Sequence, residues 1–351
     1  MKVALTFNVK PESETFLQEL SPVQKNAPHQ PEKAVDTYAE WDTWETINSI
    51  KNALALYNDV ELVEANESAF EKFKQMQPDI VFNFAEGLKG ISREAQIPAM
   101  LDMLDIPYTG SDPLTLATCL DKARTKEVLT YHGIPNPKFI LADTVEKISD
   151  HCLRFPLIVK PYSEGSGKGI FSTSYVKNQE ELIREVNRVL SEYEQPALIE
   201  EFLPGREFTV AILGNDDDAE VLPVVEINYN DFPDGFIPIY SFEAKWILDT
   251  RENPLDVFTC PAEISKDLEL QIKDPVLKAY KTLRCRDWSR IDVRLDADNI
   301  PNIIEVNPIP GILPNPEDNS CFPKAARTVG LSYDDIVNKV LYVAAKRHKL
   351  L

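Results

Sequence analysis

Two stretches near the end of the chain place charged side chains at alternate positions. In residues 290–295 (RIDVRL), Arg290 and Asp292 alternate with apolar residues, and alternate residues of a strand point to the same face. After a polar turn, Glu305 and Asn307 repeat this alternation in a second strand. A hairpin of the two strands would bring Asp292, Glu305 and Asn307 together. Two carboxylates and an amide oxygen form a set of hard oxygen ligands that suits magnesium beside phosphates.

The exposed outer face of an edge hairpin would show the same alternation. The functional interpretation is favoured because two successive strands carry the pattern, and the second runs directly into the loop Asn-Pro-Ile-Pro-Gly at 307–311. Strand ends and the loops that follow them are where binding and catalytic residues concentrate.

A glycine-rich loop, YSEGSGKGI at 162–170, follows an apolar strand. Gly165, Gly167 and Gly169 allow the backbone to approach a ligand closely and to donate N–H groups to a phosphate. Lys160, at the end of the preceding strand, is placed to reach the same phosphate. The loop lacks the Walker order GxxxxGK[ST], so it predicts a flexible phosphate cover rather than a P-loop. The tip of a mobile hairpin is the alternative interpretation.

A third stretch, LIEEFLPGRE at 198–207, leaves a strand where backbone groups can be presented to a base. Glu200 or Glu207 would then reach adenine or ribose. Exposed acids on a loop are the default interpretation of such residues, and Lys245 is unremarkable on its own.

Strands and helices alternate along the chain, which predicts an α/β fold with a parallel sheet in its first part. We expect three units, with boundaries 1–118, 119–202 and 203–351. The expected strands are 3–7, 60–63, 79–83, 107–110, 138–141, 157–161, 197–202, 207–213, 221–228, 290–295 and 302–307. The expected helices are one that follows a capping pair of Asp42 and Glu45 and runs to 57, and those at 68–75, 93–104, 122–132, 179–193, 268–283 and 333–346.

The composition excludes several classes of protein. The 351 residues are 43% hydrophobic, enough to bury a core, and the formal net charge is −20, which disfavours binding to nucleic acid or to an anionic membrane. No stretch approaches the ~18 continuous apolar residues of a membrane span, and the first apolar run is too short for a signal peptide. The five cysteines are odd in number and form no CxxC pair, which is typical of free thiols in a reducing cytosol.

Together these stretches resemble the ATP-grasp superfamily, and within it the D-alanine–D-alanine ligase family, over about residues 79–345. The resemblance implies a three-domain ATP-grasp fold: a Rossmann-like N-terminal domain, a central ATP-binding subdomain with the glycine-rich loop, and a C-terminal catalytic subdomain. The matching motifs, in family order, are YTGS (108–111), LDKARTK (120–126), VKP (159–161), EGS (164–166), EFTVAI (207–212), EAK (243–245), CPA (260–262), RIDV (290–293), EVN (305–307) and PG (310–311).

The resemblance also implies roles for individual residues. Those implied to contact ATP are Lys122, Lys160 and Lys245 at the phosphates, Glu200, Glu201 and Leu203 at adenine, and Glu207 at ribose. Those implied to bind magnesium are Asp292, Glu305 and Asn307. Those implied to act on the substrates are Arg290 and the Gly311 N–H, which stabilise the tetrahedral intermediate, Ser166 at the first substrate, and Ser320 at the carboxylate of the second.

The implied activity is that of an ATP-dependent carboxylate–amine ligase with two Mg²⁺ ions, or Mn²⁺ in their place. ATP would phosphorylate a carboxylate, an amine would attack the acyl phosphate, and phosphate would leave. Closure of the loop at 163–171 would exclude water from this intermediate. The implied partners are a small-molecule carboxylate and amine, with no nucleic acid and no membrane, in a cytoplasmic homodimer.

The chain departs from the family pattern in the parts that face the substrates. A longer Pro-rich segment at 10–40 replaces the Gly-rich N-terminal signature, so Glu45 is the candidate acid for the first substrate's ammonium group. Trp246 stands where the family has Tyr, and its ring N–H cannot accept a hydrogen bond, so the usual Ser–Tyr–Glu network cannot form intact. The loop at 82–87 and the Pro-Ile pair after Asn307 also differ from the family.

Three functions therefore remain open: synthesis of the D-alanine dipeptide, ligation of another amino acid or amine-bearing metabolite, and non-catalytic sensing of ATP or an amino acid. Retention of the three implied metal ligands and of Arg290 argues against the sensor, because a binding module needs no group to stabilise an oxyanion.

Overall fold

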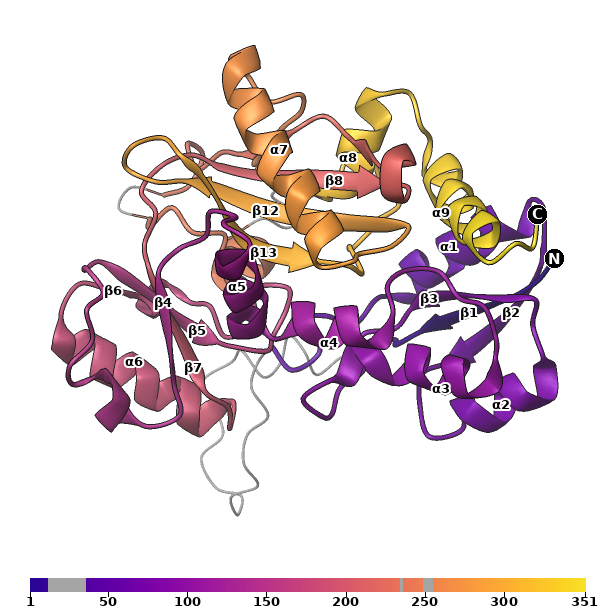
Figure 1. Cartoon of the computed structure of the whole chain (residues 1–351), viewed down its shortest axis with the longest axis horizontal. Coiled ribbons are helices and arrows are strands. Elements are labelled where there is room, and N and C mark those ends of the chain that lie inside the picture. The colour runs from indigo at the N-terminus through magenta and orange to yellow at the C-terminus, as the bar shows by residue number, and fades with distance from the viewer. Residues whose placement is uncertain (12–35, 234–235, 249–254) are drawn as a thin grey trace.

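The computed structural model describes residues 1–11, 36–233, 236–248 and 255–351, except for the side chains of Trp246 and Ile247. Figure 1 shows three sheets with helices packed around them. The expected loop at 10–40 therefore lies mostly outside the described residues. Within the described residues, no helix is both long enough and apolar enough to cross a membrane.

The first sheet is parallel, with strand order β2–β1–β3. Its strands are buried in the centre because helices cover both faces, as in other parallel sheets. The expected strand at 107–110 reduces to a single parallel bridge between Val81 and Tyr108. The elements of this part are β1 (Lys2–Phe7), α1 (Trp44–Ala55), β2 (Asp59–Glu64), α2 (Ala69–Met76), β3 (Ile80–Phe84), α3 (Gln96–Leu104) and α4 (Pro113–Leu120).

Two helix starts in this part differ from the sequence prediction. The cap of α1 is Thr43, whose side chain accepts from the Thr46 N–H, rather than Asp42. Asp42 instead joins the sheet margin, where its N–H donates to the Asn8 carbonyl (3.2 Å). Helix α4 was not predicted; Asp112 caps it and proline stands in its first turn, both ordinary start signals on a helix of only eight residues.

The second sheet is antiparallel, with strand order β4–β7–β5–β6. Helix α6 covers one face, where Leu182, Val186 and Val189 pack on Leu157 and Val159. Its elements are α5 (Lys122–Tyr131), β4 (Phe139–Ala142), β5 (Leu157–Pro161), β6 (Tyr175–Val176), α6 (Gln179–Glu192) and β7 (Ala197–Glu201).

The third sheet has the order β11–β10–β8–β12–β13, with β9 beside β8. The expected strand at 221–228 is two strands because Pro223, which has no N–H to donate, interrupts the ladder. Helix α7 packs on this sheet in the core that contains Ile272 and Val276 (Figure 1). Its elements are β8 (Glu207–Leu213), β9 (Glu220–Val221), β10 (Val225–Ile227), β11 (Phe258–Thr259), α7 (Lys266–Thr282), β12 (Trp288–Leu295) and β13 (Pro301–Asn307).

Two helices complete the chain, α8 (Cys321–Thr328) and α9 (Tyr333–Arg347). Only α9 was predicted. The C-terminal helix returns to the first part of the chain: α9 lies beside α1 in Figure 1, and Asn338 donates to the Ala53 carbonyl (2.8 Å). The predicted mixed α/β architecture with a parallel first sheet is confirmed.

Candidate active site

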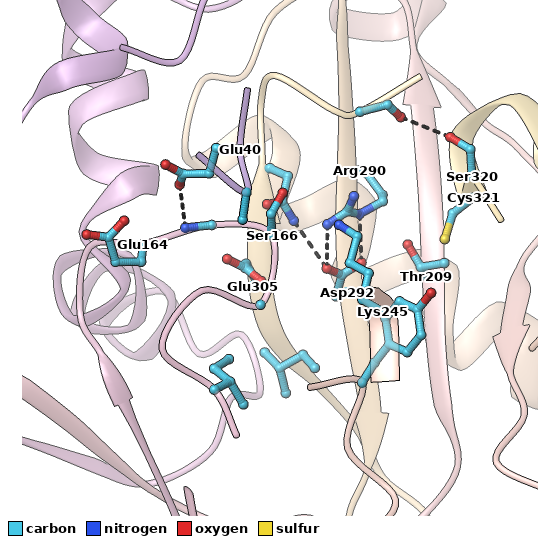
Figure 2. Close-up of a pocket in the computed structure, with 18 of the residues that line it drawn as sticks. Glu40, Glu164, Ser166, Thr209, Lys245, Arg290, Asp292, Glu305, Ser320 and Cys321 are labelled. Atoms are coloured by element: carbon cyan, nitrogen blue, oxygen red, sulfur yellow. Dashed lines mark hydrogen bonds and ion pairs between the residues drawn. The ribbon is translucent and has the colours of Figure 1, made fainter. Parts of the chain in front are cut away.

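A cavity of about 600 Å³ lies where the three parts of the chain meet. Figure 2 shows charged side chains from several elements pointing into it. The side chain of Trp246 lies outside the described residues. The other site residues predicted from the sequence all line this cavity: Glu45, Lys122, Lys160, Ser166, Glu200, Glu201, Leu203, Glu207, Lys245, Arg290, Asp292, Glu305, Asn307, Gly311 and Ser320.

The predicted hairpin is present as β12 and β13. Asp292 pairs with Glu305, and Arg290 with Asn307, so the four side chains share one face. The Arg290 guanidinium donates two hydrogen bonds to Asp292, each 3.0 Å long, and the Asn307 amide donates to the same carboxylate at 3.2 Å. Cation and acid are thus held together at the cavity wall (Figure 2).

Lys122 connects the hairpin to the glycine-rich loop. At the start of α5, its ammonium group pairs with Glu305 (2.9 Å) and donates to the Glu164 carbonyl. Burial opposes the ionisation of Glu305, but the charges of Lys122 and Lys160 outweigh it and hold the pKa at about 2. Glu305 is therefore a carboxylate at neutral pH, available to balance cationic ligands.

A second acid, Glu200 on β7, lies between two lysines. Its carboxylate pairs with Lys126 (2.7 Å) and with Lys160 (2.8 Å), and the three side chains are almost completely buried. Burial alone would raise the pKa of Glu200, but the two ammonium groups outweigh this effect and hold the pKa below its usual value. Lys126 was not among the residues predicted from the sequence. Its position one helical turn after Lys122 was the available signal, because residues four apart share a helix face.

The neighbouring predicted residues take different positions. Glu207, on β8, pairs with Arg294 (2.6 Å) and accepts from the Tyr229 hydroxyl (2.8 Å). Glu201, also in the cavity wall, pairs with the exposed Arg154 (3.0 Å). Arg294 is a further buried charge that sequence analysis did not single out.

Lys245 lies beside Arg290 and Cys321 in Figure 2. Burial, together with the nearby charge of Arg290, lowers the pKa of this lysine to about 8. The Cys321 thiol lines the same wall, and burial raises its pKa to about 12, so it is a thiol rather than a thiolate at neutral pH.

The glycine-rich loop differs from the sequence prediction in one respect. Two of its glycine N–H groups, which were expected to donate to phosphate, already donate to carboxylates: Gly165 to Glu40 (2.6 Å) and Gly169 to Asp36 (2.7 Å). Both acids come from the stretch just before α1. They were missed because nothing in the local sequence shows what they contact.

Comparison with known proteins agrees with this geometry. The family model described as "D-ala D-ala ligase C-terminus" matches residues 127–342. The D-alanine–D-alanine ligase of Actinobacillus pleuropneumoniae serotype 5b is 34% identical over 293 residues, which cover 82% of this chain and 88% of that protein. The uncharacterized protein y4sG of Sinorhizobium fredii is 36% identical over 270 residues, covering 77% of this chain and 75% of its own.

This chain belongs to the D-alanine–D-alanine ligase family. The predicted family and enzyme class, an ATP-dependent ligase, are confirmed. The crystal structure of D-alanine–D-alanine ligase from Bacillus anthracis complexed with ATP superimposes with a TM-score of 0.68 at 22% identity, over 100% of this chain and 99% of that chain. At that identity the superposition shows the fold, which is the predicted ATP-grasp fold.

In this member of the D-alanine–D-alanine ligase family, several acids line the cavity close to the start of α1 and to the 82–94 segment. Glu45, the acid expected from the sequence, is exposed in the first turn of α1 at the cavity margin. Asp42, Glu86 and Glu94 also line the cavity. Burial raises the pKa of Asp42 and of Glu94 to about 7 each, and that of Glu86 well above its usual value.

Ser320 lies beside Gly311 in the wall of the cavity. The Ser320 hydroxyl accepts from the Leu313 N–H (3.1 Å) and is 3.4 Å from the Gly311 carbonyl. A side chain added at Gly311 would meet no atom within 4 Å, so the backbone of this loop faces open space. Both residues are thus positioned to meet a ligand in the cavity.

Proposed function

We propose that this chain forms an amide bond between a small-molecule carboxylate and an amine, with ATP and Mg²⁺, through an acyl phosphate, and releases ADP and phosphate. One observation carries the proposal: three lysines, Arg290 and the acids of the β12–β13 hairpin line the same cavity. A cavity with cations for a polyphosphate beside carboxylates for a metal suits transfer of a phosphoryl group.

The residues fit a magnesium site. Asp292 and Glu305 offer carboxylate oxygens from paired positions of adjacent strands, and Asn307 offers an amide oxygen from the same face. Among the described residues no three His, Cys, Asp or Glu side chains gather as a metal site, so the third protein ligand we propose is the Asn307 amide. Bound Mg²⁺, or Mn²⁺, would neutralise charge on the phosphates.

The protein groups supply the remaining steps. We propose that Lys122, Lys160 and Lys245 neutralise the phosphates of ATP as the γ-phosphoryl group moves to the carboxylate oxygen. Arg290 and the Gly311 N–H would stabilise the oxyanion that forms when the amine attacks the acyl carbon. The adenine end of the cavity would be formed by Glu200, Glu201 and Leu203, with Glu207 at the ribose.

For the substrates we propose amino acids, with Ser166 near the first and Ser320 at the carboxylate of the second. The relative from Actinobacillus pleuropneumoniae named above is a D-alanine–D-alanine ligase. The acids Asp42, Glu86 and Glu94, which also line the cavity, favour a second candidate, a ligase that joins an amino acid or metabolite with an additional amine. The three units 1–118, 119–202 and 203–351, a homodimer and a cytoplasmic location complete the proposal.

A turnover screen tests this function. Purified protein with ATP and MgCl₂ is incubated with all pairs of L- and D-amino acids, ADP release is recorded, and products are identified by mass spectrometry. A D-alanine dipeptide would support the first candidate, and another amide the second. ADP release without any amide product would contradict the ligase proposal, and ATP binding without turnover would contradict the proposal that both substrates are amino acids.

The variant Asp292→Asn tests the metal and oxyanion assignment. We expect kcat to fall about 100-fold or more, because the variant removes the negative charge of a metal ligand and the charge that pairs with Arg290. The affinity for ATP should change far less, because the three lysines remain. Asp298→Asn, an exposed site in the turn of the same hairpin, is the matched control. Equal kcat in the two variants would refute the assignment.

A further inference from the structure

Residues 36–42, called here the strap, cross from the first sheet to the glycine-rich loop. The strap is fixed to the first part of the chain at its end: the Asp42 carbonyl accepts from the Lys10 N–H (2.8 Å), and the Trp41 ring N–H donates to the Gly87 carbonyl (2.9 Å). Asp36 and Glu40 are buried although both are acids. Buried acids require partners, and each of these two has one in the glycine-rich loop and one outside it.

Glu40 makes the central contact. Its Oε1 accepts from the Gly165 N–H at 2.6 Å and from the Arg93 guanidinium at 2.6 Å, and the Arg93 and Glu40 side chains are each 5% exposed. A methyl group at position 165 would lie 2.7 Å from this oxygen, so the close approach requires glycine there. Asp36 contacts the same loop four residues later, where it accepts from the Gly169 N–H and also from the Tyr193 hydroxyl, each at 2.7 Å.

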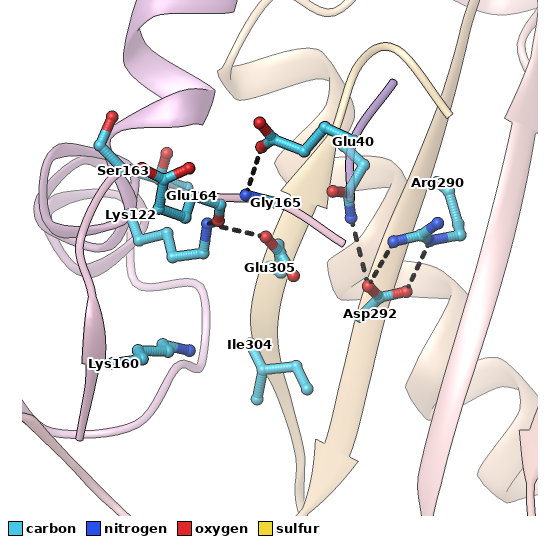
Figure 3. A network of polar contacts seen from close by, with 12 residues as sticks. Glu40, Lys122, Lys160, Ser163, Glu164, Gly165, Arg290, Asp292, Ile304 and Glu305 are labelled. Atoms are coloured by element: carbon cyan, nitrogen blue, oxygen red, sulfur yellow. Dashed lines mark hydrogen bonds and ion pairs between the residues drawn. The ribbon is translucent and has the colours of Figure 1, made fainter. Parts of the chain in front are cut away.

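Arg93 extends the contact to both sides of Gly165. Its guanidinium also donates to the Ser163 carbonyl (2.7 Å) and to the Glu164 carboxylate (3.3 Å). The carbonyl of Glu164 accepts from Lys122, which pairs with Glu305 at 2.9 Å. Figure 3 shows Glu40 bonded to Gly165, Lys122 bonded to Glu305 below them, and the Arg290–Asp292 pair at the right of the same view. A continuous polar chain therefore runs from the strap to the catalytic hairpin.

The residue that follows Gly165 is strained. Ser166 has a φ of 53°, in the left-handed region that non-glycine residues rarely adopt. Such a conformation persists only when its surroundings hold it, and the bond from Gly165 to Glu40 lies directly beside it. Ser166 is also the loop residue that we place at the first substrate, so the strap acts on the backbone that positions it.

We propose that Glu40 is a positioning residue that holds the glycine-rich loop closed over the reacting groups, so that the acyl phosphate meets the amine before it meets water. The inference rests on the proposed ligase function and adds a determinant from outside the ATP-binding elements. Because the bonds run through loop N–H groups, Glu40 sets the position of the loop without touching the reacting atoms.

The test compares Glu40→Gln with wild type in two measurements. Glutamine keeps one acceptor but removes the charge opposite Arg93, and loss of a hydrogen bond to a charged group shifts an equilibrium about tenfold or more. With the amino-acid pair found by the turnover screen, we expect ADP released per amide formed to rise several-fold over the wild-type ratio. If the substitution only destabilised the fold, the amounts of ADP and amide would fall together and their ratio would stay unchanged.

The second measurement needs no substrate. Hydrogen–deuterium exchange of peptides covering 163–170, with and without MgADP, reports loop opening directly. We expect about tenfold faster exchange in Glu40→Gln. Glu127→Gln is the matched control, because Glu127 also pairs with an arginine (Arg124, 2.5 Å) but is exposed on α5. If Glu40→Gln does not fold, Glu40→Asp retains the charge with a shorter reach and should give a smaller effect of the same sign.

The outcomes separate the two proposals. Wild-type exchange rates in a folded Glu40 variant would overturn the positioning role whatever the protein catalyses. Faster exchange together with an unchanged ratio of ADP to amide would also overturn it, because the loop would then open without exposing the intermediate. Absence of any amide product from wild type would reject the ligase function, while the exchange experiment would still decide whether Glu40 holds the loop.

Discussion

At the scale of single residues, the lysines of the cavity are distinguished by their charged neighbours and by the pKa shifts that burial causes. Lys122 and Lys160 each contact a carboxylate, at 2.9 and 2.8 Å. For the third lysine, Lys245, burial and the neighbouring Arg290 lower the pKa to about 8. An ammonium group destabilised in this way is suited to bind an arriving anion, since a phosphate would replace the water that burial removed.

This shifted pKa predicts a pH dependence. Lys245 is charged below about pH 8, so kcat/KM for ATP should fall as the pH rises through that value. Stability should change in the opposite direction. Between about pH 8 and 10.5 the Lys245 side chain is protonated in the unfolded chain but mostly neutral in the folded chain, so the free energy of unfolding should rise with pH over this range. The measurements are pH profiles of kcat/KM and of urea unfolding.

Lys245→Arg is the control for this pH dependence. An arginine stays protonated throughout the range, so its kcat/KM should lose the decline near pH 8. A decline that persists unchanged in Lys245→Arg would show that another group is responsible.

At the scale of elements, the helices begin where capping side chains are present. Thr43 starts α1 by accepting from the Thr46 N–H, and this places Glu45 at the cavity margin. Ser68 precedes α2 without a side-chain bond to the helix and bonds instead to Asn66. The two residues look alike in the sequence, and only their backbone conformations distinguish them.

This difference gives a stability prediction. Thr43→Ala should lower the free energy of unfolding by about 1 kcal/mol, because an N–H of α1 loses its acceptor. Ser68→Ala, the matched control, should change it by much less. Denaturant unfolding followed by circular dichroism measures both. A loss at position 68 as large as that at 43 would contradict the capping assignment.

At the scale of the whole molecule, distant parts of the chain join at one buried acid. Asp287 is completely buried, and its carboxylate accepts from the Gly110 N–H (2.8 Å), the Asn215 amide (2.7 Å) and Arg347 (2.8 Å). Arg347, at the end of α9, also donates to the carbonyls of Tyr108 and Gly110. This joint holds the first part of the chain against the third sheet and thereby fixes the cavity between them.

Arg347→Ala should therefore lower the free energy of unfolding by about 2 kcal/mol, because a buried acid loses its cationic partner. Arg286→Ala is the matched control. Arg286 pairs with Asp216 at 2.8 Å, but the Asp216 side chain is 79% exposed, and such surface pairs contribute about 0.5 kcal/mol or less. Thermal unfolding of both variants measures the difference. Equal losses of unfolding free energy would refute the stabilising role of the contacts between Arg347 and Asp287.

The sequence by itself determined the features that depend on residues close together in the chain, namely strand periodicity and short motifs. Strand periodicity placed Arg290 and Asp292 on one face, and family motifs located the lysines and acids, which all line one cavity. Periodicity is local, so it survives in the sequence whatever the chain packs against. Short elements such as α4 and α8, and the break at Pro223, escaped because few residues carried their signal.

Only the tertiary structure decided which charges meet across the fold. Nothing near Glu40 in the sequence indicates that it binds Gly165 and Arg93, and nothing near Glu200 indicates two lysine partners. These contacts join residues that are far apart in the sequence, and their strength comes from the low dielectric of the buried interior. Burial is a property of the assembled fold, and therefore so are the shifted pKa values and the position of the loop.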